Sequence, residues 1–302
     1  MDRREFLSST VSFCALASLK HFSALSLSIL NKKSPSSHFD KGSKTQSIFS
    51  QIIKRGQKEG WQPLSIGETI GNIGKLLIGT RYVGGTLEGE GPEICRIDLT
   101  GLDCVTFFEN VLCTARILKK RKTTFDDLRA EVTFTRYRGG KLTDYTSRLH
   151  YTSDWIYDNE KKEVVKNITK EIGGEELPIE VFFMSKNPHL YRALKKSPEF
   201  IETIAEIERE INKRRHWYIP QSRVKEVQKY IHTGDIIALA TDKEGLDFAH
   251  TGLAYKTPEG KLRFLHASQK EGKVALDREL YEYISSVETQ IGITVARPLE
   301  VK

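Results

Sequence analysis

Cys104 is the residue in this sequence whose type and position best suit covalent chemistry. The four residues before it have the composition of a helix entry, with Thr100 or Asp103 as the N-terminal cap, so the thiol falls in the first helical turn. The helix dipole favours the thiolate there, and free N–H groups of that turn can donate to an oxyanion beside the sulfur. From the helix alone, a buried packing cysteine is the slightly favoured interpretation.

Two histidines could supply the base that such a thiol needs. His250 and His266 lie on either side of a turn-rich segment centred on Pro258. A hairpin with that centre puts His250 directly opposite His266, and Ala254 opposite Leu262. Directly opposite side chains share one face of a sheet, with Cβ atoms about 5 Å apart. The spacing therefore predicts that the two imidazoles are neighbours.

The face of the sheet that carries His250 continues with Gly252 and Ala254, which are small enough to let the helix of Cys104 pack closely. A nucleophilic cysteine, a base and a third polar residue that orients the base form the arrangement that thiol acyl transfer needs. Each histidine alone is equally a hydrogen-bonded sheet residue, and zinc bound by both histidines and a cysteine is a minority alternative because no carboxylate lies at ligand spacing. We therefore predict a triad that needs no metal or cofactor.

A second cluster, formed by Arg148, His150, Tyr151 and Trp155, is basic and aromatic. Such a cluster can form a sugar- or peptide-binding wall, with Arg148 as a contact for a carboxylate of the ligand. A loop that packs on its own aromatic residues explains the pattern about as well. The sequence leaves both interpretations open.

The elements that must position these residues change character along the chain. An apolar stripe through Ile48 and Ile52 predicts a first helix, a capping box at Ser65 and Glu68 opens a second, and a third runs from Cys104 to about Lys119. One further helix follows Pro198. Beyond Gly234, four short apolar segments bounded by turn residues predict strands: Asp235–Ala240, Phe248–Tyr255, Leu262–Ala267 and Ile291–Ala296. Helices followed by an antiparallel sheet indicate the α+β class.

The other three cysteines carry no recognisable chemistry. Cys113 lies half a helical turn away from Cys104 and is predicted to pack in the core, as is Cys95. Cys14 falls in the N-terminal segment without the small preceding residue of a lipoprotein signal. No CxxC pair is present to bind zinc, and four cysteines are too few for a disulfide scaffold in a chain of 302 residues.

The N-terminus resembles an export signal of the twin-arginine type. Arg3 and Arg4 precede an apolar, serine-rich stretch that ends near Leu30, too interrupted by polar residues to anchor in a membrane. A retained amphipathic helix is the alternative. The predicted organisation is an export signal over 1–30, a flexible leader over 31–44, and a single catalytic domain over 45–302 with an elaboration over about 136–232. The protein is then periplasmic or otherwise exported.

Composition restricts the class of protein but does not name a partner. A hydrophobic content of 38% and a charged content of 29% exclude disordered and collagen-like chains. The net charge of +7 suits an anionic partner such as a nucleic acid, a membrane surface or a cell-wall polymer. Nucleic-acid binding is the weakest of these because the basic residues are dispersed and no recognised motif is present.

Several separated motifs, in order, resemble a known family. The segments Leu102–Cys104, Gly234–Ala238 and His250–Ala254 resemble those of NlpC-type papain-like cysteine peptidases of the bacterial cell wall. More specifically, the following segments resemble the N-acetylmuramoyl-L-alanine amidase-like family: Tyr82–Glu88, Asp103–Asn110, Ser147–Tyr151 with Asp154-Trp155, and Val295–Pro298. The resemblance extends from about Ile48 to Pro298.

This resemblance implies a papain-like core in which the Cys104 helix packs on the sheet. It implies Cys104 as nucleophile, His250 as base and His266 as the orienting residue, with Tyr82 and Asp103 flanking the site. The implied reaction is hydrolysis of the amide between N-acetylmuramic acid, with its 1,6-anhydro form as one alternative, and L-alanine. The implied partner is a muropeptide or peptidoglycan. An endopeptidase of the same fold, which cuts within the stem peptide, and a non-catalytic wall-binding protein are the alternatives.

Overall fold

The computed structural model describes residues 36–301 of the chain, and side chains from Gly42 onward. The predicted export signal over residues 1–30 lies outside the described residues. The predicted leader over 31–44 is wrong from Ser36 onward, because Ser36–Lys58 form one continuous helix, α2. Thr45 of this helix is buried and its hydroxyl accepts from Leu99 N at 3.1 Å. A helix anchored in this way extends backwards at little cost, even where the sequence has no apolar period.

The fold combines helices with one antiparallel sheet, as the α+β prediction requires. The remaining helices are α3 (Ile66–Leu76), α4 (Cys104–Lys119), α5 (Phe125–Arg136), α6 (Thr152–Lys161), α7 (Phe183–Lys186), α8 (Arg192–Lys196), α9 (Glu199–Asn212), α10 (Val224–Val227) and α11 (Leu280–Ser285). The strands are β1 (Val165–Asn167), β2 (Glu175–Glu176), β3 (Trp217–Pro220), β4 (Ile236–Thr241), β5 (Phe248–Lys256), β6 (Leu262–Ser268), β7 (Lys273–Glu279) and β8 (Gln290–Pro298). All four strands predicted beyond Gly234 are present, and β7 is an addition to them.

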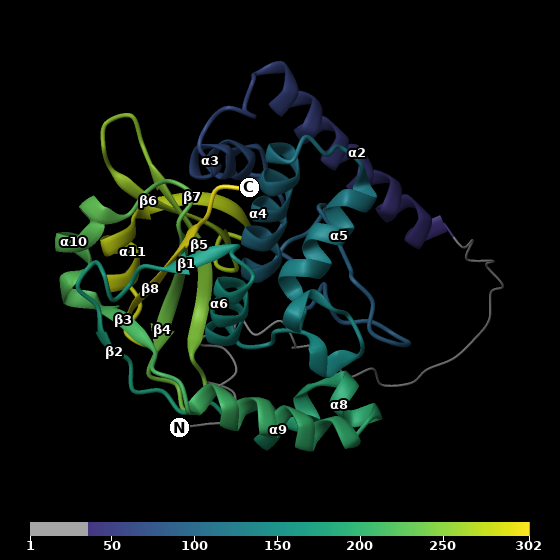
Figure 1. Ribbon diagram of the computed structural model, residues 1–302, viewed down its shortest axis with the longest axis vertical. Coiled ribbons are helices and arrows are strands. Elements are labelled where there is room, and N and C mark those ends of the chain that lie inside the picture. Colours follow the sequence, from purple (N-terminus) through teal and green to yellow (C-terminus); the bar gives the residue numbers. More distant parts are fainter. Residues whose placement is uncertain (1–35, 302) are drawn as a thin grey trace, which may run out of the picture.

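The sheet lies between two groups of helices (Figure 1). Its strand order is β2-β3-β8-β4-β5-β6-β7, with β1 paired to β8. One apolar core joins helices α2 to α6 to one face of the sheet through residues such as Leu253 and Leu265. A second core joins the short helices α10 and α11 to the opposite face through Ala254 and Phe264. The two faces of β5 and β6 therefore have different coverings.

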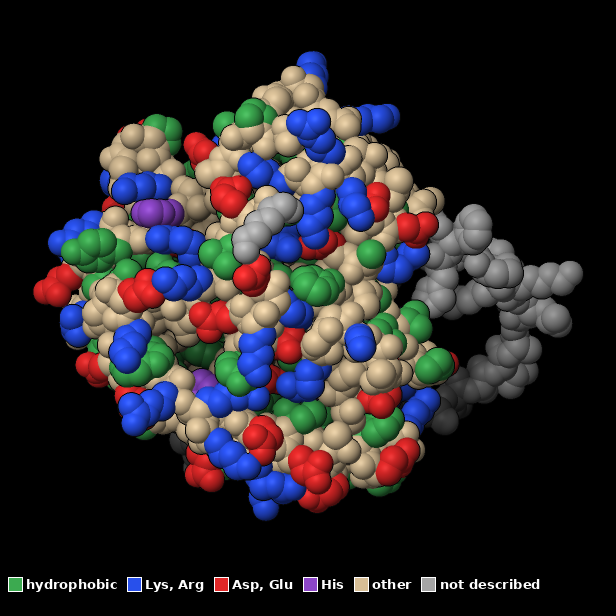
Figure 2. Space-filling model, in the orientation of Figure 1, with side chains coloured by type: hydrophobic (Ala, Val, Ile, Leu, Met, Phe, Trp, Pro, Cys, Tyr) green, Lys and Arg blue, Asp and Glu red, His purple; other side chains and the backbone are tan. Residues whose placement is uncertain are grey.

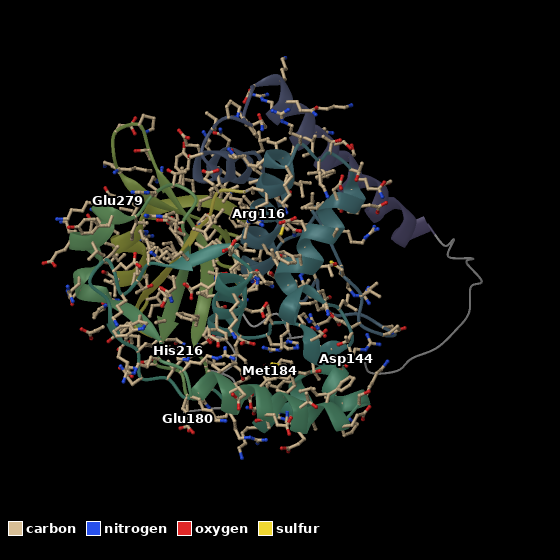
Figure 3. The ribbon with its side chains drawn as sticks, viewed as in Figure 1. Arg116, Asp144, Glu180, Met184, His216 and Glu279 are labelled. Carbon is tan, nitrogen blue, oxygen red and sulfur yellow. The ribbon has the colours of Figure 1, made fainter. Side chains whose placement is uncertain are left out.

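Helix α4 is the centre of the helical layer. Its residue Arg116 donates to Glu131 of α5 at 2.6 Å, and both side chains are buried. Figure 3 shows Arg116 in this layer and Glu279, the last residue of β7, in the sheet. A second buried pair, Arg136 Nε to Glu109 Oε2 at 2.7 Å, joins the same two helices. These pairs fix the position of α4, because a buried charge is costly unless it is paired.

The elaboration over residues 136–232 completes the sheet instead of standing apart from it. Strands β1 and β3 both pair with β8, which is the C-terminal strand. Its helices form their own apolar cluster, in which Met184 of α7 is buried against α9 (Figure 3). Glu208 of α9 holds this cluster together, since its Oε1 accepts from Tyr151 Oη at 2.7 Å and from Met184 N at 3.1 Å.

The surface gives little indication of a partner. On the face shown in Figure 2, basic and acidic side chains are interspersed and do not form one large patch of either sign. No helix among residues 36–301 is both long enough and apolar enough to span a membrane. The excess of positive charge is therefore dispersed over this face.

Candidate active site

Cys104 is the first residue of α4, and the N-terminal cap is Asp103. Asp103 Oδ1 accepts from Thr106 N at 2.8 Å, and Thr106 Oγ1 accepts from Asp103 N at 2.9 Å, which completes a capping box. Of the two caps that the sequence allowed, the structure selects Asp103. The thiol of Cys104 is 3% exposed and stands at the positive end of the helix dipole, the environment that favours a thiolate.

The segment that contains Tyr82 lies directly beside this helix entry. Val83 N donates to Leu102 O at 3.0 Å, and Leu102 N donates to Arg81 O at 3.0 Å. On its other side, Tyr82 N donates to Gly272 O at 2.7 Å in the turn before β7. Tyr82 is partly buried against the main core. The backbone thus brings Tyr82 to the start of α4, two residues from Cys104 across the Tyr82–Leu102 bridge.

The two predicted histidines are in contact on one face of the sheet. His250 Nε2 and His266 Nδ1 are 2.6 Å apart, a hydrogen-bonding distance. His266 is fully buried and His250 is 8% exposed. The second ring nitrogen of His266, Nε2, lies 3.4 Å from Asp277 Oδ2 of β7. The structure therefore presents a chain of three side chains: His250, His266 and Asp277.

The register that the sequence predicted for these histidines is wrong. Ala254 pairs with Phe264 and Leu262 pairs with Lys256, so His250 and His266 are diagonal neighbours and not directly opposite. The hairpin loop is centred one residue later than predicted, because Thr257 N donates to Lys261 O at 2.9 Å and Gly260 adopts a φ of +83°. A three-residue loop that ends in a left-handed glycine fixes this register.

The prediction that the Cys104 helix packs on the face of Gly252 and Ala254 is also wrong. Gly252 and Ala254 face the core of α10 and α11, whereas α4 packs on the opposite face, against Leu253 and Leu265. The small size of Gly252 serves another purpose. A Cβ at this position lies 2.7 Å from both the Cβ of His266 and the ring of Phe264. Glycine therefore allows the close diagonal approach of the two histidine strands.

This close approach leads to a stability prediction. Gly252→Ala is expected to lower the free energy of unfolding by about 1–3 kcal/mol, because the added methyl group overpacks the space beside His266. Urea denaturation measures the difference. Gly42→Ala in α2 is the matched control, since nothing lies within 4 Å of a Cβ there and helical alanine is favoured over glycine. Equal stability of Gly252→Ala and the wild type contradicts the packing described.

Tyr283 of α11 packs beside the two histidines. Its ring centroid lies 4.9 Å from that of His266 and 6.4 Å from that of His250. Burial raises the pKa of Tyr283, and the neighbouring acidic groups of Asp277 and Cys104 raise it further. The Tyr283 ring therefore lies against both histidines.

Burial determines the charge states of the three hydrogen-bonded side chains, His250, His266 and Asp277. Desolvation lowers the pKa of His250 well below 6.5, and His266 lowers it further. Desolvation also lowers the pKa of His266, although Asp277 opposes the shift. The hydrogen bond from His266 holds the pKa of Asp277 below its usual range. At neutral pH the site therefore contains two neutral imidazoles and one carboxylate.

The lowered histidine pKa values predict a pH-dependent stability. Below about pH 6.5 the unfolded chain binds a proton at His250 that the folded chain does not bind, so the free energy of unfolding falls as the pH falls. The loss is at most about 1.4 kcal/mol per pH unit for this group. Urea denaturation at pH 7.5, 6.5 and 5.5 should show a shallower dependence in His250→Gln. An unchanged dependence contradicts the buried, neutral state.

The predicted substrate wall lies largely in the interior. Trp155 is 2% exposed, packs edge-on against Phe108 at 5.0 Å and donates to Glu109 at 3.2 Å. Arg148 is 4% exposed and forms ion pairs with Glu88 at 2.9 Å and Glu93 at 3.2 Å. The geometry thus matches the alternative interpretation, a loop packed on its own side chains, for these two residues.

His150 belongs to the same packed loop. Its Nε2 lies 2.8 Å from Tyr145 O, and burial lowers its pKa well below 6.5, with a further contribution from Arg148. The side chain is less deeply buried than Arg148 or Trp155. Its hydrogen bond to the backbone orders the turn that precedes α6, which is a structural function.

Cys113 and Cys95 both pack in the core, as the sequence predicted. Cys113 is fully buried, its Sγ lies 3.2 Å from Thr135 Oγ1, and burial raises the pKa of its thiol well above the ordinary value. Cys95 is partly buried against the main core, and burial raises its pKa as well. Within the part of the chain that the structure describes, no group of three His, Cys, Asp or Glu side chains is arranged to bind a metal.

Sequence reasoning missed Asp277 and Tyr283. A signal for Asp277 is present, because Val274 and Leu276 alternate with Lys273, Ala275 and Asp277 after Gly272, a pattern typical of a half-buried strand. Tyr283 has no such signal. It reaches the site because α11 turns back over β6 and β7, which depends on the tertiary fold.

The family model and a solved structure that match this chain indicate the same family. The family model described as N-acetylmuramoyl-L-alanine amidase-like matches residues 72–293. A crystal structure of an N-acetylmuramoyl-L-alanine amidase from Bacteroides uniformis is 31% identical, with a TM-score of 0.73, over 78% of this chain and 99% of that one. No protein among the curated sequences matches.

Two further solved structures are similar. One, named a putative xylanase from Bacteroides fragilis, is 34% identical with a TM-score of 0.70, over 74% of this chain and 98% of that one. The other, from Legionella pneumophila, is 23% identical with a TM-score of 0.66, over 86% of this chain and 96% of that one. The second supports the fold alone.

Proposed function

Because the chain belongs to the N-acetylmuramoyl-L-alanine amidase-like family, we propose that it is a cysteine-dependent hydrolase of the amide between N-acetylmuramic acid and L-alanine in peptidoglycan fragments. The observation that carries the proposal is the 2.6 Å contact of the two buried histidines on the sheet. The same chain places the thiol of Cys104 at the capped N-terminus of α4. These are the parts that thiol acyl transfer needs.

In the proposed reaction, Cys104 is the nucleophile and His250 is the base. His250 is neutral, so it can accept the thiol proton while sulfur attacks the lactyl carbonyl carbon. The oxyanion that forms lies at the start of α4, whose first-turn N–H groups stabilise negative charge. His250 then returns the proton to the alanine nitrogen as the C–N bond breaks, which leaves a thioester.

Water completes the reaction. His250 accepts a proton from the water molecule as its oxygen attacks the thioester carbonyl, and the C–S bond then breaks. The products are the free muramic acid carboxylate, a stem peptide with N-terminal L-alanine and the regenerated thiol of Cys104. His266 orients the base throughout through its 2.6 Å contact with His250. No bound metal or cofactor takes part in this scheme.

Three finer features belong to the same proposal. We propose that the core is related to the NlpC-type papain-like peptidases, which is supported by a cysteine helix packed beside an antiparallel sheet that carries the histidines. We propose that the protein is exported or periplasmic, which is supported by Arg3 and Arg4 followed by an apolar segment. Tyr82, which lies at the entry of α4, is the proposed substrate contact. A direct contact by Arg148 or Trp155 is not part of the proposal because both are buried.

Mass spectrometry of digested muropeptides tests the proposed bond. Purified protein is incubated with anhydro-muropeptides and, separately, with the non-anhydro form. The proposal expects an intact stem peptide with free N-terminal L-alanine. L-alanine-D-glutamate that remains on the sugar identifies an endopeptidase and overturns the amidase proposal. The ratio of rates on the two sugars defines the sugar form that the protein prefers.

A further inference from the structure

We propose that Asp277 is a positioning residue that sets the proton arrangement of the two histidines, so that His250 presents an unprotonated Nδ1 to its reaction partner. This inference rests on the proposed function for its role in catalysis. The hydrogen-bond chain itself stands on geometry: 3.4 Å from Asp277 Oδ2 to His266 Nε2 and 2.6 Å from His266 Nδ1 to His250 Nε2. Neither the sequence motifs nor the family resemblance included Asp277.

A bulge in β7 gives Asp277 its position. Leu276 pairs with Leu265 and Glu279 pairs with Arg263, so β7 has one residue more than β6 between these pairs. Asp277 follows Leu276 and lies on the face of the sheet that carries His266. Its other oxygen, Oδ1, accepts from Arg278 N at 2.7 Å. The carboxylate is therefore held in one orientation, with Oδ2 directed at the imidazole.

The proton arrangement follows from donor and acceptor counting. An ionised carboxylate only accepts, so the nitrogen of His266 that faces it must carry the proton. A neutral imidazole has one N–H, so Nδ1 of His266 is then an acceptor. His250 Nε2 must donate across the 2.6 Å contact, and the only basic nitrogen left on His250 is Nδ1. The carboxylate thus selects a tautomer two side chains away.

The reverse arrangement keeps the hydrogen bond between the two rings but breaks the one to Asp277. It sets a lone pair of His266 Nε2 against the carboxylate and leaves His250 with a proton on Nδ1, where a base needs a lone pair. Water cannot relieve the conflict because His266 is fully buried. Its ring is stacked on Phe264 with centroids 4.5 Å apart and is covered edge-on by Tyr283 at 4.9 Å. Burial also keeps His266 neutral, since it lowers the pKa of this ring.

The test compares Asp277→Ala, Asp277→Asn and wild type, with two readouts that need no muropeptide. Nitrogen-15 NMR of the His250 ring is expected to show a protonated Nε2 and an unprotonated Nδ1 in wild type. In Asp277→Ala it is expected to show a mixture of the two neutral tautomers. Alkylation of Cys104 by iodoacetamide is expected to slow in the same variant. With muropeptide, kcat should fall about 10- to 100-fold with KM unchanged. Asp277→Asn keeps an acceptor oxygen, so its kcat and its alkylation rate should lie between those of wild type and Asp277→Ala.

The control is Glu271→Gln. Glu271 is exposed and acts on His266 only through its charge, without a hydrogen bond. A loss of activity in Asp277→Ala but not in Glu271→Gln supports a hydrogen-bonding role over a general effect of charge. Unchanged NMR signals and alkylation in both Asp277 variants overturn the inference, even if wild type is an amidase. If wild type does not hydrolyse muropeptide while Asp277→Ala still shifts both readouts, the proton arrangement stands and the proposed function fails.

Discussion

Cys104→Ala is expected to lower kcat/KM for muropeptide hydrolysis by at least about 10⁴-fold. The reason is that the acyl intermediate forms on the sulfur of Cys104, and no other group at the start of α4 can replace it. The capping box of Asp103 and Thr106 is kept, so the variant should fold, and loss of the buried thiol should cost about 1 kcal/mol of stability. The measurement is release of stem peptide with time, beside a urea denaturation curve.

Cys113→Ala is the matched control for this variant. Cys113 lies on the same helix, but it is fully buried against Thr135 and takes no part in the proposed site. Its removal should leave kcat/KM near the wild-type value while it costs about 1 kcal/mol of stability. If Cys104→Ala turns over wall fragments as fast as wild type, thiol catalysis is wrong. A non-catalytic wall-binding function then becomes the better explanation.

His250→Gln is expected to lower kcat/KM by about 10²–10⁴-fold, the usual contribution of a general base. Glutamine approximates the size of the ring but cannot accept the thiol proton. Because His250 and His266 are only 2.6 Å apart, the variant also leaves His266 Nδ1 without its partner. Single-turnover kinetics should show that formation of the thioester, and not only its hydrolysis, becomes slow.

The control for the base is His232→Gln. His232 is exposed on the segment before β4 and does not contact the histidine pair, so its loss should leave the rate unchanged. Equal losses in the two variants would point to a general effect of removing histidine. A His250→Gln variant with wild-type kcat would remove His250 from the mechanism and leave Cys104 without a base.

Local patterns predicted the elements that carry the site. The capping box at Ser65 and Glu68 and the helix from Cys104 to Lys119 have the predicted positions, because caps and apolar periods are local properties. The strands of both histidines are also present with nearly the predicted ends. The sequence could therefore assign the thiol to a helix entry and the two imidazoles to one hairpin.

Tertiary geometry decided what local patterns could not. The hairpin register depended on whether the loop centres on Pro258 or one residue later, and this choice follows from the left-handed Gly260. The burial of Arg148 and Trp155 depends on partners more than thirty residues away, such as Glu88 and Glu109. Asp277 reaches the site through a bulge in β7, whose position spacing alone does not specify.

Hydroxylamine trapping tests the central claim most directly, because it reports both the nucleophile and the bond. A thioester on Cys104 partitions between water and hydroxylamine, and mass spectrometry identifies the hydroxamate that is released. We predict the hydroxamate of the muramic acid lactyl group, formed by wild type and absent with Cys104→Ala. A hydroxamate that retains L-alanine-D-glutamate, or hydrolysis that continues without any hydroxamate, would contradict a cysteine-dependent amidase.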